Sequence, residues 1–294
     1  MKILWMSSLR PFTISKSNDF IQESFINSVK SLDCDIELSL TQFNEKGVEE
    51  YLAKKKINKF YINLSKNSLP HGKKYSNKIM IKNALEQFLD YDFTHLVYST
   101  ADIIVPANLI NYLKKLNDKN KEYCALIYPN ILCKNGVIKN SFWPHYGIDL
   151  FVFKISKEKA KLFLEIIKSW NQYDWGINDN FYVSVCDALS LKIFNMYKKS
   201  SVIKYENNFE QFDENEKWRT LSWIENNNYF KVFLKSNNLS LSYSNFSYYY
   251  ILYKIFNLRD VSFKLMVSYF LFYTYFPLLK IYKLLYSKIK SILR

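Results

Sequence analysis

The clearest candidate for chemistry is an acidic residue that follows a short apolar run. Residues 94–98 are expected to form a buried β-strand, and Thr100-Ala101-Asp102 comes shortly after them, ahead of an apolar step to Pro106. A carboxylate at the carboxyl end of a strand can hold Mg²⁺ or Mn²⁺ against a diphosphate, which gains charge as it departs. We therefore interpret Asp102 as a candidate ligand of a divalent cation. The alternative is that Asp102 only caps the turn or helix after the strand.

The elements that must position this acid alternate along the first part of the chain. Apolar runs predict strands at residues 2–7, 35–40, 59–64 and 94–98, and helices are expected at 20–32, 47–55 and 76–89. This alternation predicts a mostly parallel sheet with helices on both faces. Ligands of such sheets bind beyond the carboxyl ends of the strands. Ser7, at the end of the first strand, and Arg10, after it, are therefore candidate ligand-binding residues, and an Arg can hold a phosphate with two hydrogen bonds.

The order of elements is less regular after Asp102. Helices are expected at residues 106–116, 156–170, 178–190 and 218–234, strands at 123–128, 148–153 and 201–205, and a loop at 129–144. Residues 1–235 would form the main domain, residues 236–246 a Ser/Asn-rich linker, and residues 247–294 a separate basic and aromatic tail.

The segment around Thr100-Ala101-Asp102 resembles the GT-A glycosyltransferases, in which the fourth strand commonly ends in an Asp-x-Asp motif followed by apolar residues and Pro. The resemblance covers residues 1–205 and implies a GT-A-like, Rossmann-type sheet and a nucleotide-sugar donor. It also implies a divalent cation, Mn²⁺ or Mg²⁺, held by Asp102. Thr100 stands in place of the first acid of the motif, so Asp102 would contact the cation directly and Thr100 would at most contribute to its outer coordination shell.

Other residues gain a role from the same resemblance. The helix before the motif strand of these enzymes often presents a basic or amide residue to the nucleotide, which makes Asn77 and Lys78 candidates for contact with the diphosphate or ribose. The alternative is that Lys78 is a solvated lysine at a helix start.

A second segment, residues 143–156, corresponds to the strand that lines the sugar and acceptor pocket in these enzymes. Gly147 would let the backbone approach a ligand closely. Trp143 and Tyr146 could stack on a sugar face. His145 could be a metal ligand or an acceptor contact, and the alternative is a hydrogen-bonded structural histidine.

A third segment, residues 174–182, places an acid just ahead of an apolar helix. Inverting GT-A enzymes carry their catalytic base there, so the resemblance implies that Asp179 removes the proton of the acceptor hydroxyl. Asp174 is the rival candidate. The alternative for Asp179 is a helix-terminal carboxylate stabilised by the helix dipole.

The formal net charge of +14 predicts contact with a polyanion, and about half of the surplus lies in residues 247–294. Residues 265–279 of this tail carry no charge but are too few to span a membrane, and Pro277 interrupts them. Lysines and tyrosines on both sides favour a helical segment that lies on an anionic membrane surface. The alternative is a set of core helices of a soluble oligomer. No nucleic-acid recognition signature is present, so nucleic acid is not expected as a partner.

Cysteine usage and the N-terminus indicate the compartment. Cys34, Cys124, Cys133 and Cys186 form no CxxC pair and no close Cys/His cluster, so reduced thiols are expected rather than disulfides or a zinc site. The first apolar run is too short for a signal peptide. The protein is expected at the cytoplasmic face of the inner membrane.

These features together predict a glycosyltransferase that moves a sugar from a nucleotide-sugar donor to a lipid-linked, lipopolysaccharide-type or capsule-type glycan acceptor. Metal dependence and inversion are both expected. A nucleotidyltransferase usually has a Gly-rich, basic phosphate loop after the first strand, and Ser7-Ser8-Leu9-Arg10-Pro11 lacks it. The remaining alternative is a non-catalytic, membrane-associated adaptor derived from a glycosyltransferase.

Overall fold

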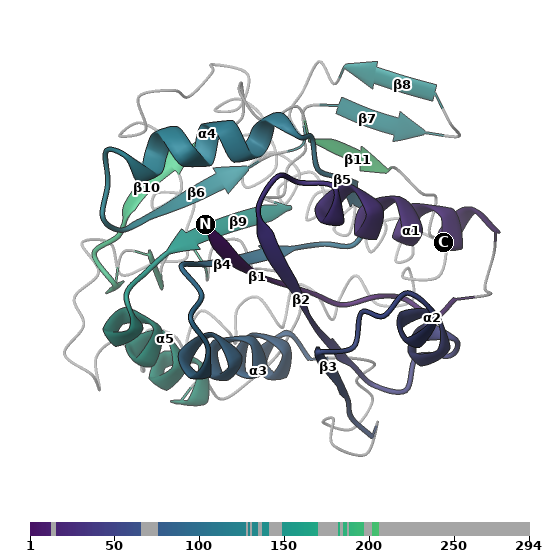
Figure 1. Ribbon diagram of the computed structural model, residues 1–294, viewed down its shortest axis with the longest axis horizontal. Helices are drawn as coiled ribbons and strands as arrows, with labels where there is room; N and C mark the ends of the chain where they lie inside the picture. The colour runs from purple at the N-terminus through teal and green to yellow at the C-terminus, as the bar shows by residue number, and fades with distance from the viewer. Residues whose placement is uncertain are drawn as a thin grey trace, which may run out of the picture.

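The framework of the molecule is a seven-stranded sheet of order β10-β6-β9-β4-β1-β2-β3 (Figure 1). The computed structural model describes residues 1–12, 16–65, 76–127, 129, 131–134, 137–140, 149–169, 182, 185–186, 188–196 and 202–205. Most neighbouring strands are parallel, and helices flank the sheet. The α/β class with a mostly parallel sheet is therefore confirmed.

The central strands of this sheet are buried on both faces. The strands are β1 Lys2–Ser7, β2 Asp35–Gln42, β3 Phe60–Asn63, β4 His95–Ser99, β6 Tyr123–Ile127, β9 Leu150–Lys154 and β10 Lys192–Asn195. β1 is parallel to β2 and β4, whereas β9 runs antiparallel between β4 and β6. β4 and β6 are buried along their whole length, as expected for strands that helices cover on both sides.

Helices α3 and α5 lie on one face of the sheet, and α1 and α4 lie on the other (Figure 1). The bounds are α1 Lys16–Lys30, α2 Val48–Lys54, α3 Asn77–Asp90, α4 Asn108–Asn117 and α5 Lys157–Ser169. Alternate residues of β1 serve the two faces. Leu4 packs in the cluster that includes α3 and α5, and Trp5 packs in the cluster that includes α1, α2 and α4.

A second, four-stranded sheet has the order β5-β11-β7-β8. Its strands are β5 Ile103–Ile104, β11 Ile203–Tyr205, β7 Ile131–Lys134 and β8 Val137–Asn140. The expectation of a loop over residues 129–144 was therefore wrong for β7 and β8, which pair antiparallel. Asn135-Gly136 between them is a dipeptide typical of tight hairpins, and the strands are too short for their alternation to stand out.

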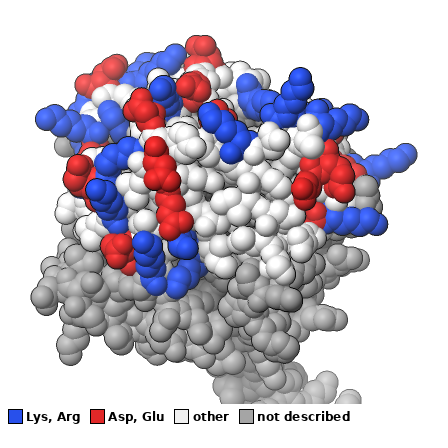
Figure 2. Space-filling model, turned by 60° about the horizontal axis from the view of Figure 1, so that its bottom comes forward, with Lys and Arg blue, Asp and Glu red and all other residues white. Residues whose placement is uncertain are grey.

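Charged side chains of both signs are interspersed on the face of the molecule in Figure 2. Several lysines pair with acids within the described residues, as Lys59 does with Glu37 at 2.7 Å and Lys2 with Asp92 at 3.1 Å. This face is therefore not a continuous basic surface.

The expected linker 236–246 and tail 247–294 lie outside the described residues. Within the part of the chain that the structure describes, no helix combines the length and apolar character needed to cross a membrane.

A buried histidine closes the amino end of β4. His95 is 1% exposed, its Nε2 lies 3.0 Å from Oδ1 of Asn117, and its Nδ1 lies 2.8 Å from the Thr94 hydroxyl. Burial lowers the pKa of His95 from an ordinary 6.5 to about 4, although the hydrogen bond with Asn117 opposes this shift, and the charges of Lys154 and the N-terminus add to it. The ring is therefore neutral in the folded protein near neutral pH.

We predict that His95 makes the protein acid-sensitive. The unfolded chain binds this proton near pH 6.5 and the folded chain only near pH 4, so stability is full above pH 6.5 and falls as the pH drops towards 4. The loss should reach about 3 kcal/mol. Urea unfolding of wild type and His95→Gln at several pH values measures it, and the variant should lack this part of the acid loss. Parallel pH curves for the two proteins would contradict the assignment.

Candidate functional site

A buried lysine joins two aspartates at the carboxyl end of β4. Nζ of Lys204 donates to Oδ1 of Asp102 at 2.8 Å and to Oδ1 of Asp149 at 2.5 Å. The Oγ1 of Thr100 lies 3.4 Å from the same ammonium. The acid that the sequence singles out therefore sits in an ionic cluster of Asp102, Asp149, Lys204 and Thr100, which we call the Lys204 cluster.

The antiparallel pairing of β4 and β9 brings Asp149 to Thr100. Ser99, the last residue of β4, is opposite Leu150, the first of β9. The pairing continues by one residue, because the Thr100 amide donates to the carbonyl of Asp149 at 3.1 Å, and the Thr100 hydroxyl donates to Oδ1 of Asp149 at 3.3 Å. Register alone thus fixes this contact.

The small sheet brings Lys204 to the same place. Lys204 on β11 is opposite Ile103 on β5, directly after Asp102 in the chain. The Tyr205 amide also donates to the carbonyl of Asp102 at 2.9 Å. The side chain of Lys204 faces inward, while its neighbours on β11, Ile203 and Tyr205, are only half-buried. The lysine therefore points into the cluster because of strand alternation.

Burial makes the electrostatics of the cluster strong. Asp149 is 5% exposed and Lys204 is 9% exposed. Burial by itself would lower the pKa of Lys204, but the charges and hydrogen bonds of Asp102 and Asp149 outweigh it and raise the pKa above its ordinary value. Lys204 is therefore a permanent cation, and its single positive charge faces two carboxylates.

The residues of this cluster do not fit a divalent cation as they are arranged. A Mg²⁺ or Mn²⁺ ion needs several oxygen ligands around it. Both carboxylates direct an oxygen at the Lys204 ammonium instead. Among the described residues, no three His, Cys, Asp or Glu side chains are grouped as metal ligands.

A buried hydrogen-bond network from the neighbouring strand β1 holds the end of β4. The Ser7 hydroxyl donates to the carbonyl of Ser99 at 2.9 Å, and Nε1 of Trp5 donates to the Ser99 hydroxyl at 2.8 Å. Ser7, which the sequence suggested as a donor-binding residue, is completely buried. In this arrangement it supports the strand that presents Thr100 and Asp102.

The loop after β1 is also fixed by side chains. The Arg10 amide donates to Oε1 of Gln22 on α1 at 2.5 Å. With its amide oriented to suit its neighbours, Gln42 accepts from the Leu9 amide at 2.7 Å and donates to the carbonyl of Leu9 at 3.1 Å. Arg10 therefore lies in a loop that hydrogen bonds hold against both α1 and the end of β2.

Asn77 and Lys78 lie at the start of α3, where the Ser76 hydroxyl caps the helix by accepting from the Ile79 amide at 3.2 Å. Asn77 is buried. Nζ of Lys78 donates to the carbonyl of Lys168 at the end of α5, at 3.3 Å. The other predicted site residues lie outside the described residues, namely Trp143, His145, Tyr146, Gly147 and Asp179, with the rival Asp174.

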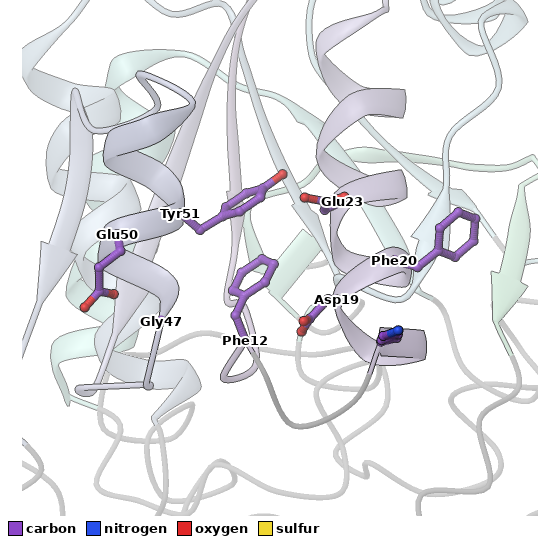
Figure 3. Close-up of a pocket in the computed structure, with 8 residues that line it drawn as sticks. Phe12, Asp19, Phe20, Glu23, Gly47, Glu50 and Tyr51 are labelled. Carbon is purple, nitrogen blue, oxygen red and sulfur yellow. The ribbon is translucent and has the colours of Figure 1, made fainter.

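A separate hollow of about 510 Å³ lies between α1 and α2 (Figure 3). The rings of Phe12 and Tyr51 stack at its wall with centroids 4.3 Å apart. The Tyr51 hydroxyl points towards Glu23 in Figure 3, and burial together with this acid raises the pKa of Tyr51 to about 12. Asp19 and Glu50 also line the hollow. It contains none of the predicted donor-binding residues, and its acids make it a poor phosphate site.

Sequence reasoning missed two members of the Lys204 cluster. Asp149 follows Gly147 by two residues at the start of an expected strand, and Lys204 is a lone charge in the expected strand 201–205. A lysine at an inward position of a short strand is a signal of a buried ionic partner. The sequence does not identify which acid is that partner.

Solved structures of known proteins share this architecture. The 1–349 segment of S. aureus TarS in complex with UDP-GlcNAc has a TM-score of 0.53 and 10% identity, over 78% of this chain and 66% of that chain. Its complex with UDP has a TM-score of 0.52 and 9% identity, over 79% of this chain and 65% of that chain. The chain thus spans just under two thirds of the TarS segment.

A 4-diphosphocytidyl-2C-methyl-D-erythritol synthase from Anaerococcus prevotii is more distant, with a TM-score of 0.42 and 10% identity over 75% of this chain and 94% of that chain. No protein-family model and no curated protein matches the sequence. The chain has a GT-A-like fold, as the resemblance of the Thr100–Asp102 segment implied.

We predict that Lys204→Met destabilises the protein by about 3 kcal/mol, because it leaves the buried carboxylate of Asp149 and the partly buried one of Asp102 without their cation. Lys82→Met is the matched control, since Lys82 pairs with Glu86 on the exposed side of α3 at 3.7 Å. That exposed pair should contribute at most about 0.5 kcal/mol. Urea unfolding at pH 7 measures both variants, and equally small losses would mean that the Lys204 cluster is not a strong buried ion pair.

Proposed function

We propose that the protein is a glycosyltransferase that moves a sugar from a nucleotide-sugar donor to a lipid-linked, lipopolysaccharide-type or capsule-type glycan. The observation that carries the proposal is the placement of Thr100 and Asp102 at the carboxyl end of β4 in a GT-A-like sheet. The similar TarS segment has been solved with UDP-GlcNAc and with UDP, which supports a nucleotide-sugar donor for this chain as well.

In the proposed reaction, an acceptor hydroxyl attacks the anomeric carbon of the donor while the bond from that carbon to the diphosphate breaks. Asp179 takes the proton of the hydroxyl, and an in-line attack inverts the anomeric centre. Arg10, Asn77, Lys78 and Thr100 help to bind the donor. Trp143, His145, Tyr146 and Gly147 line the sugar and acceptor side.

No step of the proposed reaction uses the divalent cation that the resemblance implies. Asp102 is its expected ligand, but this carboxylate already accepts from Lys204. The resemblance thus implies a metal ion at Asp102, whereas in the structure Asp102 is paired with Lys204.

A non-catalytic adaptor derived from a glycosyltransferase is the second candidate function. Thr100 in place of the first acid of the motif favours it, and so does the ion pair that engages Asp102. The two candidates differ in one property that can be measured, because an adaptor should neither bind nor turn over a nucleotide sugar.

The tail is proposed to hold the enzyme at the cytoplasmic face of the inner membrane. Lys280, Lys283, Lys288 and Lys290 lie among aromatic and aliphatic residues at the end of the chain. Each lysine near an anionic surface contributes roughly 1 kcal/mol of attraction. An acceptor that is anchored in lipid would then reach the active site by diffusing in the plane of the membrane.

We predict that the full chain releases a nucleoside diphosphate from one member of a panel of nucleotide sugars, including UDP-GlcNAc, when a suitable glycan acceptor is supplied. Asp179→Ala should lower the rate by about 100-fold or more, because general base catalysis typically contributes that much. Asp174→Ala is the matched control and should keep most of the rate.

A rate that falls with Asp174→Ala and not with Asp179→Ala would move the base to Asp174. If no donor is bound in calorimetry or turned over, the adaptor becomes the better description.

We also predict that the full chain floats with liposomes that contain anionic lipid and stays behind with zwitterionic ones. Replacing Lys280, Lys283, Lys288 and Lys290 by Gln should weaken flotation strongly, since several kcal/mol of attraction would be removed. Replacing four lysines of the described part, Lys54, Lys55, Lys115 and Lys119, by Gln is the charge-matched control. Equal flotation of the two variants would rule out the tail as the anchor.

A further inference from the structure

The position of the Lys204 ammonium is that of a cation bridging two carboxylates. It lies 2.8 Å from Oδ1 of Asp102 and 2.5 Å from Oδ1 of Asp149. A divalent ion held by Asp102 and Asp149 would need the same carboxylate groups. The ammonium and a divalent ion could therefore not both occupy the position between Asp102 and Asp149, and in the folded chain the Lys204 side chain occupies it.

The ammonium is also held there more firmly than a free ion would be. Lys204 belongs to β11, which pairs with β5 on one side and with β7 on the other. The cation is thus tethered to its ligands and has a high effective concentration, whereas a Mg²⁺ ion must first lose bound water. Displacement would leave a lysine that is 9% exposed without its two carboxylates.

The third N–H of the ammonium is held only weakly, by the Thr100 hydroxyl. Two of the three N–H groups of Lys204 have short bonds to Asp102 and Asp149. The contact to the Thr100 hydroxyl is long, at 3.4 Å. A phosphate oxygen that reaches the end of β4 could therefore take the third N–H at little cost to the other two bonds.

We propose that Lys204 is the resident cation of the transferase site, and that its ammonium takes the place of a divalent metal ion against the departing diphosphate. This role rests on the proposed glycosyl transfer. As the acceptor oxygen bonds to the anomeric carbon, the electron pair of the breaking bond stays on the phosphate oxygen, and the Lys204 N–H donates to that oxygen. The acceptor proton goes to the base, so Lys204 keeps its own protons.

Charge counting gives the proposal a consequence for the rest of the site. A divalent ion would neutralise Asp102 and Asp149 completely, but an ammonium leaves the cluster with one negative charge. Further cations must therefore offset the charge of the diphosphate. Arg10 and Lys78 are the candidates that the sequence provides near the carboxyl ends of the strands.

The first test uses Mn²⁺ alone and does not depend on activity. Electron paramagnetic resonance of the full chain titrated with Mn²⁺ should show no specific site in wild type. Lys204→Ala frees the two carboxylates and should bind Mn²⁺ at least about ten-fold more tightly than wild type, because a nearby positive charge is gone. Adding Asp149→Asn to Lys204→Ala should remove this binding again. Lys192→Ala, on the exposed end of β10, is the matched control and should behave as wild type.

Circular dichroism confirms that each variant is folded, and Lys204→Gln replaces Lys204→Ala if the smaller residue prevents folding. Specific Mn²⁺ binding by wild type that is lost in Asp102→Asn would overturn the proposal, because a metal would then displace the lysine. A folded Lys204 variant that gains no Mn²⁺ site would overturn it as well, since the two carboxylates would not form a cation site.

The second test uses the donor that wild type turns over. Release of nucleoside diphosphate should be unchanged by EDTA, and Lys204→Gln should lower it by about 100-fold, the usual effect of removing a donor to a developing negative charge. Asp102→Asn with an intact lysine should lose less. Activity abolished by EDTA overturns the resident cation but leaves the glycosyltransferase intact. Absence of activity with every donor instead removes the proposed function, and the Mn²⁺ titration still decides whether Lys204 occupies a cation site.

Discussion

The balance of charge around one buried ammonium is the constraint on which this site depends. Lys204 bonds to Asp102 and Asp149, so it joins the end of β4, the start of β9 and the small sheet. Asp102, Asp149 and Lys204 are far apart in the sequence. An ammonium or a carboxylate that lost its partner here would remain buried and charged, which is strongly unfavourable. The two sheets must therefore assemble in one register for the site to exist.

The neighbouring residues give that register a rigid base. Trp5 and Ser7 of β1 both hydrogen-bond to Ser99, the last residue of β4. The fully buried strand therefore cannot slide without breaking polar bonds in the core. Support for the site thus comes from β1, which fixes the strand end, and Thr100 and Asp102 continue beyond it. Such a preorganised base is what a charge-stabilising site requires.

Local patterns in the sequence were sufficient for the strand and helix order up to Asp102. Apolar runs such as that of β1 and the Ser76 cap of α3 encode their elements within a few residues. The position of Asp102 at a strand end could be predicted for the same reason. Its partners could not, because Asp149 and Lys204 reach it only through the pairing of β9 with β4 and of β11 with β5. Non-local register of short strands leaves almost no local signal. The hairpin of β7 and β8 is different, because Asn135-Gly136 is a local signal and only the shortness of its strands hid their alternation.

The identity of the cation between Asp102 and Asp149 also sets the net charge of the site. A divalent ion in place of Lys204 would make the two aspartates electrically neutral, whereas the lysine leaves one negative charge next to the expected phosphates. Because like charges repel most strongly where burial lowers the dielectric, a diphosphate can bind here only if other cations approach it from the side away from Asp102 and Asp149. Arg10, after the carboxyl end of β1, and Lys78, at the start of α3, are the candidates for that role in addition to Lys204. If the proposed transfer takes place here, the lysine supplies less positive charge than a divalent ion would, so donor affinity would depend more on cations in the loops around the sheet and on how those loops are held.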